Sequence, residues 1–314
     1  MVPGVSMRAF FFPGQMSEHP DMWPNLLLRF GGAGEWLQRA RVATGLPLAI
    51  EAPAAGEAGF DDLTAQMAVL TVNAAWTDCL SQHGVTPQVV TGHSLGCYSA
   101  LTVAGALGFE NALGIALRVQ QLALEELATF DGAMGVLIGH GPEKVAEACR
   151  GAGADRAMVA NVNTAKQVVI SGHAAAVDDV LADLAPGSMR AERLHTRVPF
   201  HSRWMRPVVE RLLDETDPSM FHAPRIAVYS HLDGQPVRTA GEARELICTQ
   251  IARRLDWPRV LAAMNAAGCG AFVECGPGEV LSRMTRWVLR DVSVQTVESD
   301  FTGIVGGAEA PEED

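Results

Sequence analysis

One segment, residues 88–106, constrains the fold most, because it places a serine between a strand pattern and a helix pattern. The short apolar run 88–91 predicts a buried strand, and Gly92-His93-Ser94-Leu95-Gly96 follows it directly. The apolar spacing over 97–106 predicts a helix. A strand that turns sharply into a helix exposes such a serine at its tip, and small neighbours let the backbone pass close by. The segment therefore predicts an α/β fold with a nucleophilic Ser94; the simpler interpretation is a helix start that Ser94 merely caps.

Strand and helix patterns alternate along most of the chain, which predicts a parallel sheet covered by helices. Asp61 or Asp62 suits the N-cap of a helix over 61–83. Further strands are predicted at 8–12, 226–229 and 271–274, and further helices at 111–128, 203–214, 241–254 and 279–290. The fold class that follows is α/β, with a large α/β-hydrolase-like domain built on a parallel sheet.

The pattern changes near Gly132. Strands are predicted at 134–138, 158–162, 167–171 and 191–198, and helices at 142–149 and 174–184. This strand–helix–strand–strand–helix–strand order predicts a small ferredoxin-like α+β domain over 132–198. It is inserted into the large domain, which takes 1–131 and 199–300. The tail over 301–314 is rich in glycine and acidic residues, so we expect it to be disordered.

Composition and charge exclude several classes of protein. Apolar residues make up 48% of the 314 residues and charged residues 19%, which allows a sizeable core and excludes global disorder. The net charge of −12 argues against a nucleic-acid binder. No run reaches the ~18 apolar residues that span a bilayer, so we expect a cytoplasmic protein with no membrane partner. The six cysteines show no zinc spacing, which favours a reducing compartment and no metal site.

A serine hydroxyl needs a base before it can attack a thioester or an ester, and the chain offers nine histidines. His93 neighbours Ser94 in the sequence, so we expect its side chain to point away and to have a structural role. His201 lies where a predicted strand ends and a helix begins, which is where catalytic residues gather in α/β folds. From the residues alone, His201 is favoured over His195 and His231 only by this position.

Six motifs occur in one order along the chain and cover residues 7–295. They are Phe12-Pro13-Gly14-Gln15; Gly92-His93-Ser94-Leu95-Gly96 with Tyr98-Ser99-Ala100; Gly132-Ala133-Met134; residues 161–172 (NVNTAKQVVISG); Pro199-Phe200-His201-Ser202; and Glu274-Cys275-Gly276-Pro277-Gly278. In this set the chain resembles the malonyl-CoA:acyl carrier protein transacylase family, which includes the acyltransferases of polyketide synthases. The resemblance implies an enzyme that passes an acyl group between thioesters through an acyl-serine intermediate.

The resemblance also implies roles for individual residues. Ser94 is the implied nucleophile and His201 the implied general base, with a backbone carbonyl at Gln250 orienting the imidazole. The amides of Gln15 and Leu95 are the implied oxyanion donors. The implied substrate-contacting positions are His93, Arg118, Val119, Asn161 and Phe200. No metal and no redox cofactor is implied, because the acyl group arrives as a thioester on the phosphopantetheine of a carrier protein or on coenzyme A.

One departure from the family bears on the substrate. Malonyl-type members carry an arginine on the second helix after the nucleophile, where it pairs with the free carboxylate of the acyl group. Alignment from Ser94, or backward from Gly132-Ala133-Met134, puts Val119 at that position. Arg118 is adjacent, but one step along a helix rotates a side chain by ~100°. We therefore predict that the carboxylate clamp is absent; the alternative is a helix irregularity that lets Arg118 serve.

These inferences give one main functional hypothesis and three alternatives. The main hypothesis is a discrete, trans-acting acyltransferase of polyketide biosynthesis. It moves an acyl group without a free carboxylate between carrier-protein or coenzyme A thioesters. The alternatives are a malonyl-CoA:acyl carrier protein transacylase that uses Arg118, an editing hydrolase that passes the acyl group to water, and a catalytically silent subunit that binds carrier proteins.

The expected partner is an acyl carrier protein, which is acidic in this family's pathways. An acidic partner conflicts with a net charge of −12, because like charges slow encounter. A local basic rim is therefore required, and Arg203, Arg206 and Arg286 are the docking candidates. Their neighbours Arg193, Arg197, Arg283 and Arg290 extend this set, and a merely solvated face is the alternative. We expect the protein to act as a monomer and to bind no nucleic acid.

Overall fold

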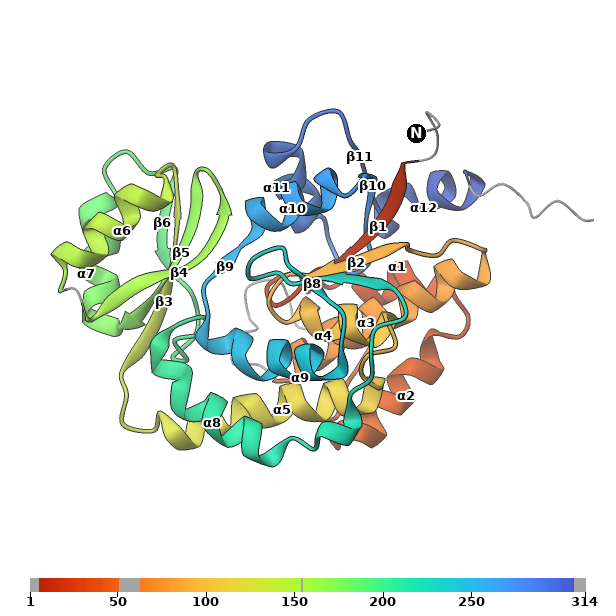
Figure 1. The fold of residues 1–314 in the computed structure, drawn as a ribbon, viewed down its shortest axis with the longest axis horizontal. Coiled ribbons are helices and arrows are strands. Elements are labelled where there is room, and N and C mark those ends of the chain that lie inside the picture. The colour runs from red at the N-terminus through yellow and green to blue at the C-terminus, as the bar shows by residue number, and fades with distance from the viewer. Residues whose placement is uncertain (1–5, 51–62, 154, 308–314) are drawn as a thin grey trace, which may run out of the picture.

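The computed structural model describes residues 6–50, 63–153 and 155–307, and it contains two β-sheets (Figure 1). The larger sheet has the strand order β11-β10-β1-β2-β7-β8. Its strands are β1 (Met7–Phe12), β2 (Val89–Gly92), β7 (Ala227–Tyr229), β8 (Pro236–Val237), β10 (Cys269–Glu274) and β11 (Ser293–Thr296). Neighbouring strands are parallel except β7 and β8, which pair antiparallel. The predicted α/β class with a parallel sheet is confirmed.

Helices cover both faces of this sheet, which explains why β1 is apolar at successive positions. Phe10 and Phe12 point into a core formed with α3 (Leu63–Gln82), α4 (Gly96–Val103) and α5 (Phe109–Glu126). Ala9 and Phe11 point into a second core, formed with α10 (Trp257–Ala266) and α11 (Val280–Val288). The remaining helices of the large unit are α1 (Met22–Leu27), α2 (Ala33–Thr44), α8 (Arg206–Glu215), α9 (Ala240–Thr249) and α12 (Val297–Gly306), with 3-10 turns η1 (Arg203–Met205), η2 (Pro218–Met220) and η3 (Gln250–Ala252).

A second sheet forms the small unit, drawn in green in Figure 1. Its order is β6-β3-β5-β4-β9. The elements of residues 132–193 are β3 (Gly132–Ile138), α6 (Pro142–Gly151), β4 (Ala157–Thr164), β5 (Gln167–His173), α7 (Ala174–Leu184) and β6 (Arg190–Arg193). They follow one another in the order that the sequence predicts. The fifth strand, β9 (Leu255–Asp256), comes from the large unit and pairs in parallel with β4, which the sequence did not predict.

The end of the chain is more ordered than its composition suggests. Helix α12 includes residues 301–306, so the prediction of disorder from residue 301 is wrong for this part. Thr296 caps the helix by accepting a hydrogen bond from the Ser299 amide at 3.2 Å, and Phe301 packs against Trp76 with ring centroids 5.8 Å apart. Acidic residues in the first turn of a helix complement its dipole, so they favour a helix here. Residues 308–314, and the predicted N-cap at Asp61 or Asp62, lie outside the described residues.

Two predicted elements end early, and each break has a local cause. The strand predicted over 191–198 ends at Arg193, because Thr196 Oγ1 accepts a hydrogen bond from the Val198 amide at 3.0 Å and turns the chain. The helix predicted over 241–254 ends at Thr249 and tightens into η3. Helices α1, α2 and α10 were not predicted. Within residues 6–50, 63–153 and 155–307, no helix combines the length and apolar character needed to cross a bilayer.

Candidate active site

Ser94 lies at the tip of a tight turn between β2 and α4, where the sequence pattern places it. Its φ of 52° falls in the left-handed region, which costs free energy for a residue other than glycine. The turn has no room for side chains on either side. A Cβ at Gly92 would lie 2.0 Å from the Gly96 oxygen, and a Cβ at Gly96 would lie 2.0 Å from the Phe12 oxygen. Close packing of the backbone therefore holds the serine in this strained conformation.

The imidazole of His201 lies against the Ser94 hydroxyl. Ser94 Oγ is 2.7 Å from His201 Nε2. On the other side of the ring, Nδ1 is 3.0 Å from the Gln250 carbonyl oxygen and 3.2 Å from the Arg253 carbonyl oxygen. Carbonyl oxygens only accept hydrogen bonds, so Nδ1 carries the ring proton and Nε2 is the acceptor for the serine proton. The structure thus brings together the three residues that the resemblance implied, in the geometry that a nucleophile and its base require.

The other histidines that the sequence left open do not reach the serine. His195 is exposed on the small unit. His231 is buried with its ring centroid 6.4 Å from that of His201, and its Nε2 lies 3.3 Å from Gln250 Oε1. His231 therefore contacts the side chain of the residue whose backbone carbonyl orients His201.

Burial keeps the His201 imidazole neutral. Removal from water lowers the pKa of His201 from 6.5 to about 4, and the nearby ring of His93 acts in the same direction. The carbonyls of Gln250 and Arg253 oppose this by stabilising the protonated ring. A base must be neutral to accept a proton, so His201 is ready to act across the physiological range.

The lowered pKa of His201 predicts that the rate of Ser94 acylation falls only at unusually low pH. The rate of Ser94 acylation by a neutral thioester should stay within about twofold between pH 8 and pH 5.5, and it should fall as the pH drops through about 4. Single-turnover acylation, followed by intact-protein mass over pH ~3–8, measures this profile. Half-maximal acylation near pH 6.5 would show instead that His201 titrates like a solvated imidazole.

Two loops after neighbouring strands meet beside Ser94. Because β1 and β2 are parallel neighbours, the loops that carry Gln15 and Leu95 emerge at the same edge of the sheet. The loops touch, since a Cβ at Gly14 would lie 3.2 Å from the Leu95 nitrogen. Leu95 is the N-cap of α4, where helix amides favour negative charge. This placement suits both residues as oxyanion donors, and that role stays a prediction.

A narrow cavity opens beside Ser94. Its lining residues are Gln15, Gln66, Ser94, Leu95, Tyr98, Ala116, Val119, Gln120, Phe200, Gln250 and Ile251. Six of the predicted site residues are among them: Gln15, Ser94, Leu95, Val119, Phe200 and Gln250. Every one of these lining side chains is uncharged, and several are glutamines, so the cavity suits an uncharged group with some capacity for hydrogen bonding.

Val119 and Arg118 point in different directions from α5. The helix is continuous over Phe109–Glu126, and Val119 lines the cavity at 5% exposure. Arg118 turns outward, with Nε 2.6 Å from a carboxylate oxygen of Glu215 and Nη1 3.1 Å from one of Glu125. The prediction that Arg118 contacts substrate is therefore wrong, because the helix rotation points its guanidinium at α8. The alternative of a helix irregularity fails for the same reason.

His93 and Asn161 are not among the residues that line this cavity, and their contact with substrate stays a prediction. His93 Nε2 is 2.9 Å from Asn163 Oδ1, and the ring packs edge-on against Trp257 with centroids 5.4 Å apart. His93 thus connects the serine turn to β4, the structural role that its position in the sequence favours. Asn161 is 7% exposed on β4, at the position that pairs with Leu255 of β9.

The predicted docking arginines lie at the surface, with different surroundings. Arg203 pairs with Asp155 at 3.0 Å and stacks over Trp204. Arg206 is exposed at the start of α8. Arg286 is exposed on α11 and donates a hydrogen bond to the Val294 carbonyl oxygen at 3.0 Å. Their role in docking stays a prediction.

Sequence reasoning missed five residues of the cavity: Gln66, Tyr98, Ala116, Gln120 and Ile251. All five are buried. The signal for the two glutamines was present, because each is a polar residue on the apolar side of a predicted helix. Tyr98 was part of a motif, but no spacing rule indicated that its ring would face the cavity. Cys97, beside it, is buried with the pKa of its thiol raised, so it is not a nucleophile.

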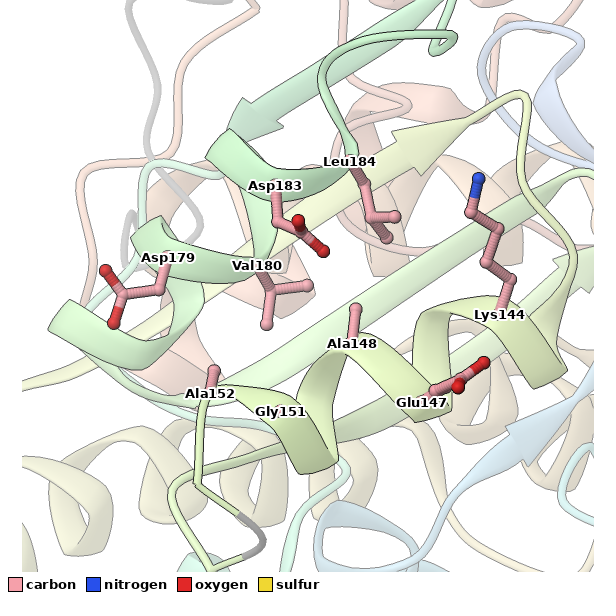
Figure 2. Close-up of a pocket in the computed structure, with 9 residues that line it drawn as sticks. All are labelled: Lys144, Glu147, Ala148, Gly151, Ala152, Asp179, Val180, Asp183 and Leu184. Atoms are coloured by element: carbon pink, nitrogen blue, oxygen red, sulfur yellow. The ribbon is translucent and has the colours of Figure 1, made fainter.

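A larger groove lies between α6 and α7 of the small unit (Figure 2). Its lining residues are Lys144, Glu147, Ala148, Gly151, Ala152, Asp179, Val180, Asp183 and Leu184. Acidic side chains from both helices border it, and its lining includes no residue of the predicted site. We regard the groove as a solvated seam between two surface helices.

Comparison with known proteins supports one family. The family model described as acyl transferase domain matches residues 54–301. The malonyl CoA-acyl carrier protein transacylase of Escherichia coli (strain K12) is 30% identical over 289 residues, which are 91% of this chain and 94% of that protein. This chain belongs to the malonyl CoA-acyl carrier protein transacylase family. The family member from Bacillus subtilis (strain 168) is 30% identical over 308 residues, 95% of each chain.

Solved structures of family members share the fold. The malonyl CoA-acyl carrier protein transacylase of Coxiella burnetii has a TM-score of 0.86 and 30% identity, and the match covers 97% of this chain and 98% of that one. A malonyl-transacylase in complex with a type II PKS acyl-carrier protein has a TM-score of 0.87 and 28% identity, over 96% and 99% of the two chains. The chain is therefore an acyltransferase of this transacylase family, as the resemblance implied.

Proposed function

We propose that this transacylase-family enzyme transfers an acyl group without a free carboxylate, through an ester of Ser94. The observation that carries the proposal is the position of Val119 in a cavity lined by uncharged side chains, while Arg118 pairs with Glu215 outside it. A malonyl carboxylate in this cavity would leave water without a cation to replace the lost hydration, and that costs several kcal/mol. An acetyl or longer neutral acyl group carries no such cost.

The proposed reaction has two matched steps. Ser94 Oγ attacks the thioester carbonyl while its proton passes to His201 Nε2, and the negative oxygen that forms is held by the amides of Gln15 and Leu95. The C–S bond then breaks, and the imidazolium returns the proton to the departing thiolate. A second phosphopantetheine thiol reverses these events and takes the acyl group. A thioester is already activated, so these groups supply the required chemistry without a metal or redox cofactor.

The malonyl transacylase alternative has its own support. The relatives described above are named as malonyl transacylases, and their names favour this alternative over the neutral-acyl hypothesis. The two differ in one measurable property, the relative rate at which malonyl and acetyl thioesters load Ser94.

The deciding experiment uses the wild-type enzyme with malonyl-CoA and acetyl-CoA in competition. Intact-protein mass separates the two adducts, and peptide mapping locates them. We expect the acetyl adduct on Ser94 to form first. A dominant malonyl adduct would overturn the neutral-acyl proposal and leave the malonyl alternative. Free acid that accumulates even when a second carrier is present would instead support the editing hydrolase.

We also propose that Arg203 and Arg286 help to dock an acidic carrier protein. Arg286 is exposed and Arg203 is half-buried at the surface of a chain whose net charge is −12, so a local basic site is needed. Reversing either charge, as Arg203→Glu or Arg286→Glu, should raise the KM for carrier protein several-fold and leave the KM for a small thioester unchanged. Arg41→Glu, on α2, is the matched control. Equal changes for both substrates would contradict a docking role.

Two finer architectural and biological points belong to the same proposal. We infer that residues 132–198 form an inserted ferredoxin-like domain, since the order β6-β3-β5-β4 with antiparallel pairing is typical of that fold.

We also infer a role in polyketide biosynthesis, which the similarity to a transacylase bound to a type II PKS carrier supports.

A further inference from the structure

A second, smaller cavity continues the line of the acyl cavity. Its lining residues are Leu70, Ala74, Tyr98, Ser99, Thr102, Val103, Phe109, Ala112 and Leu113. The same three helices form both cavities. On α3 the lining runs from Gln66 to Leu70 and Ala74, which share one helix face, and on α5 it runs back from Val119 to Ala112. The two cavities are therefore successive sections of one groove between α3, α4 and α5.

Tyr98 is the residue that the two linings share. Its side chain is 2% exposed, and its hydroxyl is hydrogen-bonded with the Gln250 side chain. That bond connects the ring, which starts on α4, to η3 on the far side of the acyl cavity. The ring thus forms a partition across the groove and is fixed at both ends.

The section beyond Tyr98 has the character of an alkyl-chain site. Leu70, Val103, Phe109 and Leu113 are among the residues that line it. Its two hydroxyl groups already have partners, because Ser99 Oγ accepts from Asn73 at 3.0 Å and Thr102 Oγ1 donates to the Tyr98 carbonyl at 2.9 Å. Ala112 lies seven residues from Val119 on the same helix, so this section lies about 10 Å further from the reacting serine.

We propose that Tyr98 sets the length of the acyl group by closing the groove between the two cavities. The proposal rests on the proposed function, since it requires an acyl group on Ser94. The wild-type enzyme takes acyl groups that end at the Tyr98 ring. Shortening this side chain opens a continuous apolar path into the second cavity, and longer alkyl chains then fit.

The test compares acetyl and octanoyl thioesters of pantetheine in single-turnover loading of Ser94, read by intact-protein mass. In the wild type the octanoyl adduct should form at least tenfold more slowly than the acetyl adduct. Tyr98→Ala should raise the octanoyl-to-acetyl ratio at least tenfold. Tyr98→Phe keeps the ring, so the ratio should stay close to that of the wild type. Thermal unfolding checks each fold, and Tyr98→Leu replaces Tyr98→Ala if the alanine variant is not folded.

A second substitution, which fills the second cavity, tests whether the longer alkyl chain binds there. Adding Ala112→Phe to Tyr98→Ala blocks only the second cavity, so it should return the ratio toward the wild-type value. An unchanged ratio in a folded Tyr98→Ala or Tyr98→Leu variant overturns the proposal, and so does a gain that survives Ala112→Phe. Failure of the proposed function looks different: malonyl outcompetes acetyl, or Ser94 carries no adduct with any thioester.

Discussion

Replacing Ser94 with alanine is expected to eliminate the acyl adduct and to lower the rate of acyl transfer by at least ~10³-fold. The Oγ atom that this change removes lies 2.7 Å from the base and at the mouth of the acyl cavity. His201→Ala should cost a similar factor, because without the base the hydroxyl is a weak nucleophile. The double variant should be little worse than either single one, since the two residues act as one unit. Transfer from acetyl-CoA to a carrier protein, with the adduct followed by mass, measures all three.

Cys97 provides the matched control for this result. Its thiol lies three residues from Ser94 and is buried, with a raised pKa that disfavours the reactive thiolate. Cys97→Ala should therefore retain the adduct and transfer within about twofold of the wild type. An acyl adduct that persists in Ser94→Ala would contradict the assignment of the nucleophile.

Introducing an arginine at position 119 is expected to shift the preference toward malonyl. Val119 lines the acyl cavity, so a guanidinium placed there can pair with the carboxylate of a malonyl group. Hydrogen bonds to charged groups contribute about 1.5–3 kcal/mol, which corresponds to a rise of about 10- to 100-fold in the malonyl-to-acetyl ratio. Competition between malonyl-CoA and acetyl-CoA, read as the two Ser94 adducts, gives this ratio directly.

Two further variants make the comparison specific. Val119→Gln adds similar bulk without charge, and it should leave malonyl disfavoured. Arg118→Ala removes a cation that already pairs with Glu215 and Glu125, so the ratio should not change. A loss of malonyl loading in Arg118→Ala would mean that Arg118 leaves this pairing and turns inward to bind substrate. Circular dichroism establishes that each variant is folded before it is compared.

The sequence predicted the arrangement of Ser94, His201 and Gln250 better than it predicted the residues that line the cavity. The turn around Ser94 is local, because adjacent glycines and a strand–helix junction define it, and the parallel sheet follows from the alternation of elements. His201 and Gln250 come from distant parts of the chain, and only the family resemblance joined them to Ser94. Arg118 does not line the cavity, because its guanidinium pairs with Glu215 and Glu125. The substrate contacts implied for His93 and Asn161 stay predictions. Such choices depend on tertiary packing, which no local pattern contains.

Composition was the least reliable guide at the end of the chain. Glycine and acidic residues favour disorder on average, yet Phe301 and Ile304 pack into the large core and hold α12 in place. The missed strand β9 has a similar cause. Two residues pair with β4 because the fold brings them there, and their own propensity contributes little.

The added strand β9 ties the geometry of the base to the position of the small unit. Arg253, whose carbonyl oxygen holds the His201 ring proton, stands two residues before Leu255, where β9 joins the neighbouring sheet. If a phosphopantetheine arm separated the two sheets, the Arg253 carbonyl oxygen would move away from the imidazole. Ser94 would then lack a correctly oriented base. The acyl group must therefore enter and leave while the two sheets stay joined through β9.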